Sequence, residues 1–311
     1  MALVTETTKA VRRTRRNSGY GGFLYPSFFI LAAFIVTMLV WNIVLSFMKY
    51  PGFGRAKWIG LKNYADLFTW DIFWESVLHS LYYVIPMAII PTVLGVFLAA
   101  AVYDAFRGRI GALFLPWVRA GLYLPQVIPI AISGTIWGWI LSQDGLLNQL
   151  LKNLGANQLT VDWLNVPIPA LASLTGIMIW LQLGFGFVIF LAGLARVDVS
   201  AIEAAQVDGA NWWQRFINLT LPALRPEILV VTLITVVGGI KVFAPIAYIT
   251  YGGPRGSTQA AASFGVDLFF GGGSIGMGSA VTTLLAVIIG VTVSVIAAVF
   301  VRRTPTERGQ R

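Results

Sequence analysis

The side chains that most often carry out chemistry are scarce in this chain, and its few site-like motifs lack their structural context. The sequence has no cysteine and a single histidine, His79, so neither a thiolate nor a His-rich metal site can be built. The run Gly271-x-Gly273-x-x-Gly276 matches the dinucleotide fingerprint, but no preceding strand or βαβ unit is predicted around it. No Gly-x4-Gly-Lys-Ser/Thr segment occurs, so we expect this chain not to bind ATP. The sequence thus predicts no catalytic residue, no metal site and no cofactor in this chain.

The composition indicates that lipid, not water, surrounds most of the chain. Of its 311 residues, 57% are hydrophobic and only 11% are charged, whereas about a quarter of a soluble domain is charged. A bilayer core requires roughly 20 consecutive apolar residues per helix. Six segments qualify: 23–47, 77–103, 113–141, 167–195, 228–248 and 275–301. We therefore expect an all-α membrane protein with six transmembrane helices.

The positions of Lys and Arg predict the orientation of these six segments. Most of them precede the first segment, follow the last, or fall between segments two and three or four and five. The positive-inside rule then places both termini in the cytoplasm. The net charge of +9 is explained by topology, and we expect no nucleic-acid partner. The predicted parts are a basic cytoplasmic N-terminus (1–22), a transmembrane domain (23–301) and a cytoplasmic tail (302–311).

The apolar segments contain prolines and almost no ionisable side chains. The prolines that interrupt them are Pro86, Pro91, Pro125, Pro129 and Pro245. They indicate either simple kinks or helices that surround a translocation path. Every Asp and Glu falls in a predicted loop or at a helix end, which argues against an ion-coupled carrier. Lys241 lies inside the fifth segment, where it either lines a polar cavity or extends toward the interface or a backbone carbonyl.

The segment 199–226 between the fourth and fifth spans carries its own helix signals. Ser200 and Glu203 fit a capping box, and Asp208-Gly209 ends the helix with a left-handed residue. Asn211 with Gln214 predicts a second start at once. An apolar face then recurs at Trp212, Phe216 and Leu219, and the unit stops at Pro222 and Pro226. These signals predict a helix-turn-helix on the cytoplasmic surface, although periodicity alone favours an ordinary amphipathic connector on the membrane interface.

The residues of this loop resemble the EAA loop of permease subunits of binding-protein-dependent ABC importers. The matching positions are Glu203, Ala204, Ala205, Asp208, Gly209, Ala210, Leu221 and Pro222. Leu219 stands where the family pattern usually has Ile, which is a conservative change. In that family the loop is the coupling helix that sits in a cleft of the ATPase subunit, so the resemblance implies this ATPase-coupling role for these residues.

Motifs in the outer loops narrow the resemblance to the carbohydrate-uptake class, similar to the maltose and glycerol-phosphate systems. They are the runs 60–64 (Gly-Leu-Lys-Asn-Tyr), 124–125 with Trp137, 145–148 (Gly-Leu-Leu-Asn), and 250–254 (Thr-Tyr-Gly-Gly-Pro) with Thr258. The resemblance implies a second homologous permease, two ATPase subunits that hold ATP and Mg²⁺, and an extracytoplasmic sugar-binding protein. It also implies a place in the cytoplasmic (inner) membrane of a bacterium or archaeon.

The same resemblance places a substrate path on the fourth and fifth segments. The candidate residues there are Trp180, Gln182, Phe185, Thr235, Gly239 and Phe243. An aromatic face beside hydrogen-bonding groups suits a sugar, although core packing is the more common role for any single one of them. Two alternatives stay open from the residues: a permease for another solute, such as a polyol phosphate or an amino acid, and an ion-coupled carrier. The sequence names neither the sugar nor the permease of the pair that holds it.

Overall fold

The computed structural model describes residues 19–106 and 111–303. Most of the predicted cytoplasmic N-terminus (1–22) and of the predicted tail (302–311) lies outside these residues. Four helices in this part are long and apolar enough to cross a membrane, or up to six spans if each of two bent helix pairs is counted as one. The four are α1 (Gly19–Ser46), α3 (Asp71–Ala105), α7 (Pro167–Leu194) and α13 (Ile275–Arg303). They correspond to the first, second, fourth and sixth predicted segments, and α3 runs through Pro86 and Pro91.

The third predicted span, 113–141, is not one continuous helix. It forms α4 (Gly111–Val127) and α5 (Ile130–Ile140), which meet at an angle of 95°. Pro129 lies at the break with extended backbone angles. A proline has no N–H to donate, and its ring clashes with the carbonyl four residues earlier. The third span therefore breaks at a proline that the sequence marked as an interruption.

The fifth predicted span, 228–248, is also interrupted. Helix α11 begins at Arg225 and ends at Ile240, and a short π-helical segment, η3 (Ile246–Thr250), follows. The chain at 241–243 is not helical. Pro245 cannot donate the hydrogen bond that would continue α11 through Lys241. Both interrupted spans thus contain a proline that the sequence had marked.

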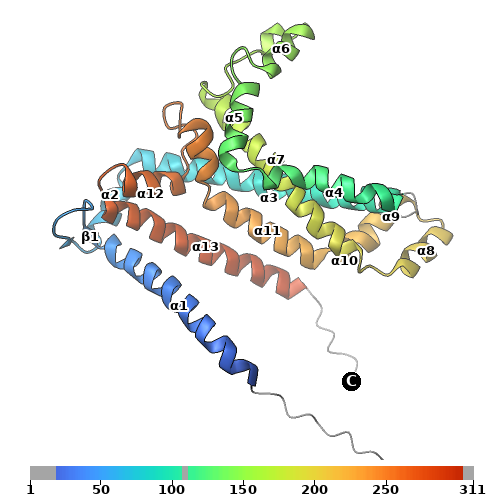
Figure 1. Cartoon of the computed structure of the whole chain (residues 1–311), viewed down its shortest axis with the longest axis horizontal. Coiled ribbons are helices and arrows are strands. Elements are labelled where there is room, and N and C mark those ends of the chain that lie inside the picture. The colour runs from blue at the N-terminus through green and yellow to red at the C-terminus, as the bar shows by residue number, and fades with distance from the viewer. Residues whose placement is uncertain (1–18, 107–110, 304–311) are drawn as a thin grey trace, which may run out of the picture.

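Short elements collect at the two ends of the helical bundle (Figure 1). At one end lie the two-residue strands β1 (Met48–Lys49) and β2 (Lys57–Trp58), paired antiparallel with Met48 opposite Trp58. Helices α2 (Lys62–Phe68) and α12 (Ala261–Phe270) lie at the same end. Helices α8 (Val199–Val207), α9 (Trp212–Arg215) and α10 (Leu221–Ala223) lie at the opposite end. Helix α6 (Leu146–Asn153) and the 3-10 turn η1 (Asn157–Leu159) extend from α5.

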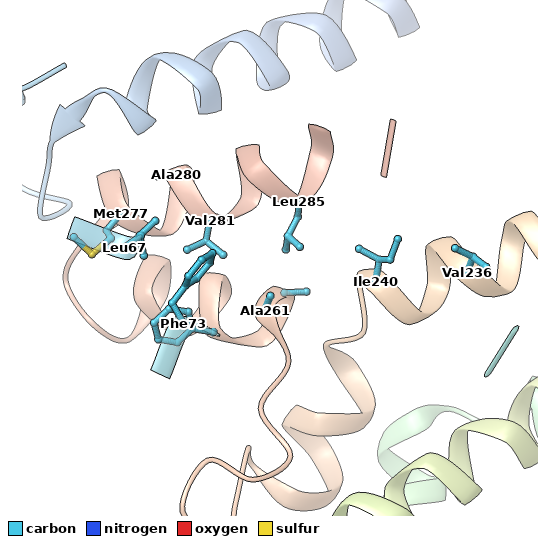
Figure 2. Packing of buried hydrophobic residues seen from close by; sticks show 11 residues of the cluster. Leu67, Phe73, Val236, Ile240, Ala261, Met277, Ala280, Val281 and Leu285 are labelled. Carbon is cyan, nitrogen blue, oxygen red and sulfur yellow. The ribbon is translucent and has the colours of Figure 1, made fainter. Parts of the chain in front are cut away.

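The bundle is built around α3, which packs against α7 and α11 over most of its length. One apolar cluster joins α3 to α2, α11, α12 and α13. Figure 2 shows Phe73 of α3, Ala261 of α12 and Val281 of α13 converging in it. Two further clusters join α3 to α7, one toward η3 and one toward the start of α11. Helix α1 stands apart and contacts α13, where the Asn42 amide donates to Thr282 and Thr283 at 3.2 and 3.1 Å.

The outer-loop motifs of the sequence supply buried polar side chains that hold the loops in place. The Asn63 amide donates to the carbonyls of Ser46 and Met48 at 2.8 and 2.9 Å. Asn148 donates to the Val161 carbonyl and accepts from the Trp163 indole at 2.9 Å. A buried amide needs such partners because its desolvation is otherwise uncompensated. These motifs therefore have a structural role that a sequence match alone does not reveal.

Candidate functional site

The 199–226 loop folds as two helical pieces joined by a tight turn at Gly209. Helix α8 (Val199–Val207) ends there with Gly209 at φ +81°. The Gly209 N–H donates to the Gln206 carbonyl and the Ala210 N–H to the Ala205 carbonyl, at 3.1 and 2.9 Å. This is the left-handed helix ending that glycine favours. The predicted helix, glycine turn and second helix are confirmed.

The second piece begins as predicted, and it contains a π-helical turn that was not predicted. Asn211 caps α9 (Trp212–Arg215) in a reciprocal capping box with Gln214, at 2.9 and 2.8 Å. The chain then widens into a π-helical turn, η2 (Phe216–Thr220), and a last short helix, α10 (Leu221–Ala223). Pro222 lies one residue before Ala223, where the helical run from Trp212 ends, and Pro226 lies in the first turn of α11. Because the helix axis bends by 70° between Ala223 and Arg225, the prediction that the unit ends at these prolines, before the fifth span begins, is confirmed.

The cap of α8 is Asp198, and the predicted capping box of Ser200 with Glu203 does not form. The Ser200 N–H donates to Asp198 Oδ1 at 2.9 Å. Hydrogen bonds from the Ser200 side chain, and then from its backbone, hold the pKa of the Asp198 carboxyl below its ordinary value. Because folding lowers this pKa, the cap contributes at neutral pH, and its contribution is lost as the pH falls through the lowered value.

We expect Asp198→Ala to loosen α8 without disturbing the spans. Loss of the cap should speed amide hydrogen exchange over residues 199–207 roughly fivefold at neutral pH. Asp198→Asn is the matched control, since Asn caps helices about as well as Asp. Hydrogen-exchange mass spectrometry on the purified protein measures both variants. Equal exchange in the two variants would contradict the assignment of Asp198 as the cap.

Arg215 fastens the loop to the end of α3. Its Nη1 donates to the Ala210 carbonyl at 2.7 Å, and its Nη2 lies 3.7 Å from Asp104 Oδ2. The Arg215 side chain is largely buried, at 16% exposed, so the pair is less screened by solvent than an ordinary surface pair. The ring of Trp212 packs edge-on against Phe97 of α3, with centroids 5.6 Å apart. These contacts hold the loop against α3.

A second connection ties α7 to the start of α11. The buried Glu227 carboxylate accepts a hydrogen bond from Arg196, which follows α7. Leu224, at the junction of α10 and α11, is fully buried in the cluster shared by α3 and α7. The loop is thus fixed at both ends and in the middle, which suits a segment that moves as one body.

The surface of the loop is open around its turn. Among the predicted coupling residues, Glu203, Ala204, Asp208, Gly209, Leu221 and Pro222 are exposed, whereas Ala205 and Ala210 are half-buried. Ile202 is buried and anchors α8 to the bundle. The small residues Ala204 and Gly209 among the exposed positions leave room for another protein to approach the backbone closely.

An open cavity of about 420 Å³ lies where the two interrupted spans face α7. Its polar lining comes from Gln126 of α4, Gln182 of α7 and Lys241, the residue that ends α11. The other lining residues are apolar and include Phe243 and Pro245. A cavity of this size, mostly apolar with a few converging polar groups, is typical of a small-molecule site.

The six predicted path residues occupy different environments. Gln182 and Phe243 line the cavity. Trp180 instead packs edge-on against Trp137 at 5.4 Å, and Phe185 packs in the cluster between α3 and α7. The Thr235 hydroxyl donates to the Val231 carbonyl within its own helix at 2.9 Å. A Cβ at Gly239 would lie 2.9 Å from Val84 Cα, so this glycine allows α11 to approach α3.

Two contributors to these sites were not predicted from the sequence. Gln126 completes the cavity because the break at Pro129 turns the end of α4 toward it, a consequence of tertiary structure. Arg215 anchors the loop through Asp104, more than 100 residues earlier in the chain. A basic side chain on the polar side of the second loop helix was the only local signal for that contact.

Interrupted membrane spans around an open cavity, with a rigid exposed loop at one end, define a membrane transport subunit. The chain belongs to the family of binding-protein-dependent transport system inner membrane components, whose family model matches residues 92–305. It is therefore a multi-pass permease subunit of an ATP-driven ABC importer in the inner membrane, and it is not an enzyme.

Individual relatives cover nearly the whole chain. It is similar to a probable ABC transporter permease protein of Bacillus subtilis, YesP, with 34% identity over 89% of each chain. It is 28% identical to the trehalose/maltose transport system permease protein MalF of Thermococcus litoralis, over 86% of this chain and 88% of that protein. The fold resembles a chain of a bacterial ABC transporter that imports the acidic polysaccharide alginate, with a TM-score of 0.73, 22% identity, and coverage of 90% of this chain and 98% of that one.

Proposed function

We propose that this permease imports a carbohydrate and forms half of the translocation path. The 199–226 loop carries the proposal, because an exposed turn at Gly209 is held rigidly to α3 by Arg215 and Trp212. The name of the trehalose/maltose relative supports a sugar as cargo. Both termini and the loop face the cytoplasm in this proposal, as the distribution of Lys and Arg predicts.

The proposed complex contains a second homologous permease, two ATPase subunits and an extracytoplasmic sugar-binding protein. ATP and Mg²⁺ bind to the ATPase subunits. Closure of those subunits moves the two coupling loops together and turns the cavity outward, and ATP hydrolysis resets it. This is a rigid-body transmission of the hinge and shear type. The contact with the ATPase is formed by the predicted coupling residues Glu203, Ala204, Ala205, Asp208, Gly209, Ala210, Leu221 and Pro222.

Reconstitution of the complete importer in proteoliposomes tests the proposal. We expect uptake of a radiolabelled oligosaccharide to require ATP on the side of the loop and the binding protein on the other side. An ionophore that dissipates ion gradients should leave uptake unchanged. Uptake that survives removal of ATP but stops with the ionophore would overturn the proposal, as would purification of the protein without a stoichiometric ATPase.

The same assay distinguishes the alternative cargoes. Amino acids and polyol phosphates serve as competitors against the labelled sugar at equal concentration. If only an amino acid competes and is itself taken up, the chain is an ABC importer permease for another solute. In that outcome the coupling role of the loop is retained and the carbohydrate assignment is wrong.

A further inference from the structure

Lys241 places a positive charge inside the membrane part of the protein. It follows α11 directly, 16 residues after Arg225, and so lies about 24 Å along the helix axis from that end at 1.5 Å per residue. The hydrocarbon core of a bilayer is about 30 Å thick. Lys241 therefore lies toward the far limit of that thickness, where it lines the cavity. An ionisable residue that lines a cavity in a membrane span usually marks a pathway.

Within residues 25–106 and 113–300, where side chains are described, the Lys241 ammonium has no carboxylate partner. The ion pairs found there are formed by Lys152, Arg196 and Arg215. No residue lining the cavity is acidic, and no hydrogen bond from Lys241 to a backbone carbonyl is formed in this region. The side chain is exposed at the cavity. The carboxyl end of α11 supplies only the partial negative charge of its terminal carbonyls.

The other polar groups of the cavity differ from Lys241 in what they can recognise. The amides of Gln126 and Gln182 both donate and accept hydrogen bonds, which suits sugar hydroxyls. An ammonium only donates, and its strongest partners are carboxylate and phosphate oxygens. A neutral sugar could be held by the amides and Phe243 alone, whereas a carboxylate or phosphate on the cargo would give the lysine a partner of opposite charge.

We propose that the cargo is an anionic carbohydrate whose carboxylate or phosphate binds Lys241 while its hydroxyls bind Gln126 and Gln182. This inference rests on the proposed function, since it specifies the class of carbohydrate. The cargo completes the charge balance of the cavity, which lacks an acidic residue of this chain. Selection against neutral sugars then occurs in the permease as well as in the binding protein.

The test compares matched pairs of sugars in the reconstituted importer with its wild-type binding protein. The probes are digalacturonate, compared with galactobiose, and cellobiouronate, compared with cellobiose. In each pair, the first sugar carries a carboxylate where the second carries a neutral group. Glucose 1-phosphate against glucose forms a separate phosphate arm. We expect uptake of the anionic member to exceed that of its neutral partner at least tenfold in one of these arms, and that arm identifies the anionic group.

Variants of Lys241 then assign the selectivity to this side chain. Lys241→Gln should lower the ratio of anionic to neutral uptake at least tenfold, and Lys241→Arg should keep the ratio within about threefold because the charge remains. Lys57→Gln on strand β2, an exposed lysine far along the chain from the cavity, should leave the ratio unchanged. The melting temperature of each purified variant is measured to verify that the variant is folded.

Two results would overturn the inference while the proposed function stands. One is ATP-dependent uptake of neutral sugars with no preference for the anionic partner. The other is an equal loss of neutral and anionic uptake in Lys241→Gln, which would assign Lys241 to a structural pair with the second permease. Uptake that does not depend on ATP would instead contradict the proposed function itself.

Discussion

Gly209→Asp is expected to abolish ATP-driven uptake while the protein still inserts into the membrane. Gly209 lies at φ +81° at the tip of the exposed loop, and no atom lies within 4 Å of the position of an added Cβ. Asp tolerates the left-handed conformation better than most residues, so the backbone costs about 1 kcal/mol. The new carboxylate therefore leaves the fold intact and projects into the surface that we assign to the ATPase contact.

Gly155→Asp provides a matched control on a different part of the molecule. Gly155 follows α6 at φ +77°, with open space around its Cβ position. Its N–H and that of Ala156 donate back to Lys152 and Leu151, the same ending that Gly209 gives α8. Both variants should lose the same small amount of stability, but only Gly209→Asp should lose uptake. Normal uptake by Gly209→Asp, or an equal loss in both variants, would exclude the coupling role.

The features that the sequence predicted well are those that depend on residues close together in the chain. Apolar runs longer than a bilayer thickness located the spans, and Asn211 with Gln214 located the start of α9. The cap of α8 shows where local patterns become ambiguous, because Asp198 and Ser200 are both good capping residues two positions apart. Asp198 comes first in the chain and is the residue that caps the helix. The prediction from Ser200 was therefore correct that the helix has a side-chain cap and wrong about which residue provides it.

The features that could not be predicted depend on contacts between distant segments. Pro129 and Pro245 signalled interruptions, but the 95° bend between α4 and α5 follows from how α5 packs against η3. Trp180 had the right chemistry for a sugar platform, yet its ring packs nearly perpendicular to that of Trp137 and does not line the cavity. Lys241 was equally consistent with two environments until Gln126 and Gln182 were found beside it in one cavity.

Gly184→Ala is expected to destabilise the membrane domain strongly, although it adds a single methyl group. A Cβ at this position of α7 would lie 2.1 Å from the Leu122 carbonyl oxygen and 2.7 Å from Tyr123 Cα. Both are backbone atoms of α4, so no side-chain rotation can relieve the overlap, and the two helices must separate. Overpacking of this kind costs about 3 kcal/mol, which lowers the melting temperature of the purified protein by roughly 10 °C.

Gly176→Ala on the same helix separates this close approach from the general effect of replacing glycine in a helix. No atom lies within 4 Å of a Cβ at Gly176, and alanine is the better helix former by about 1 kcal/mol. We therefore expect its melting temperature in detergent to equal or exceed that of the wild type. If the Gly184→Ala and Gly176→Ala variants have the same melting temperature, α4 and α7 are not in close backbone contact. The separation of α4 from α7 would also move Gln126 away from Gln182, so a folded Gly184→Ala protein should lose uptake along with stability.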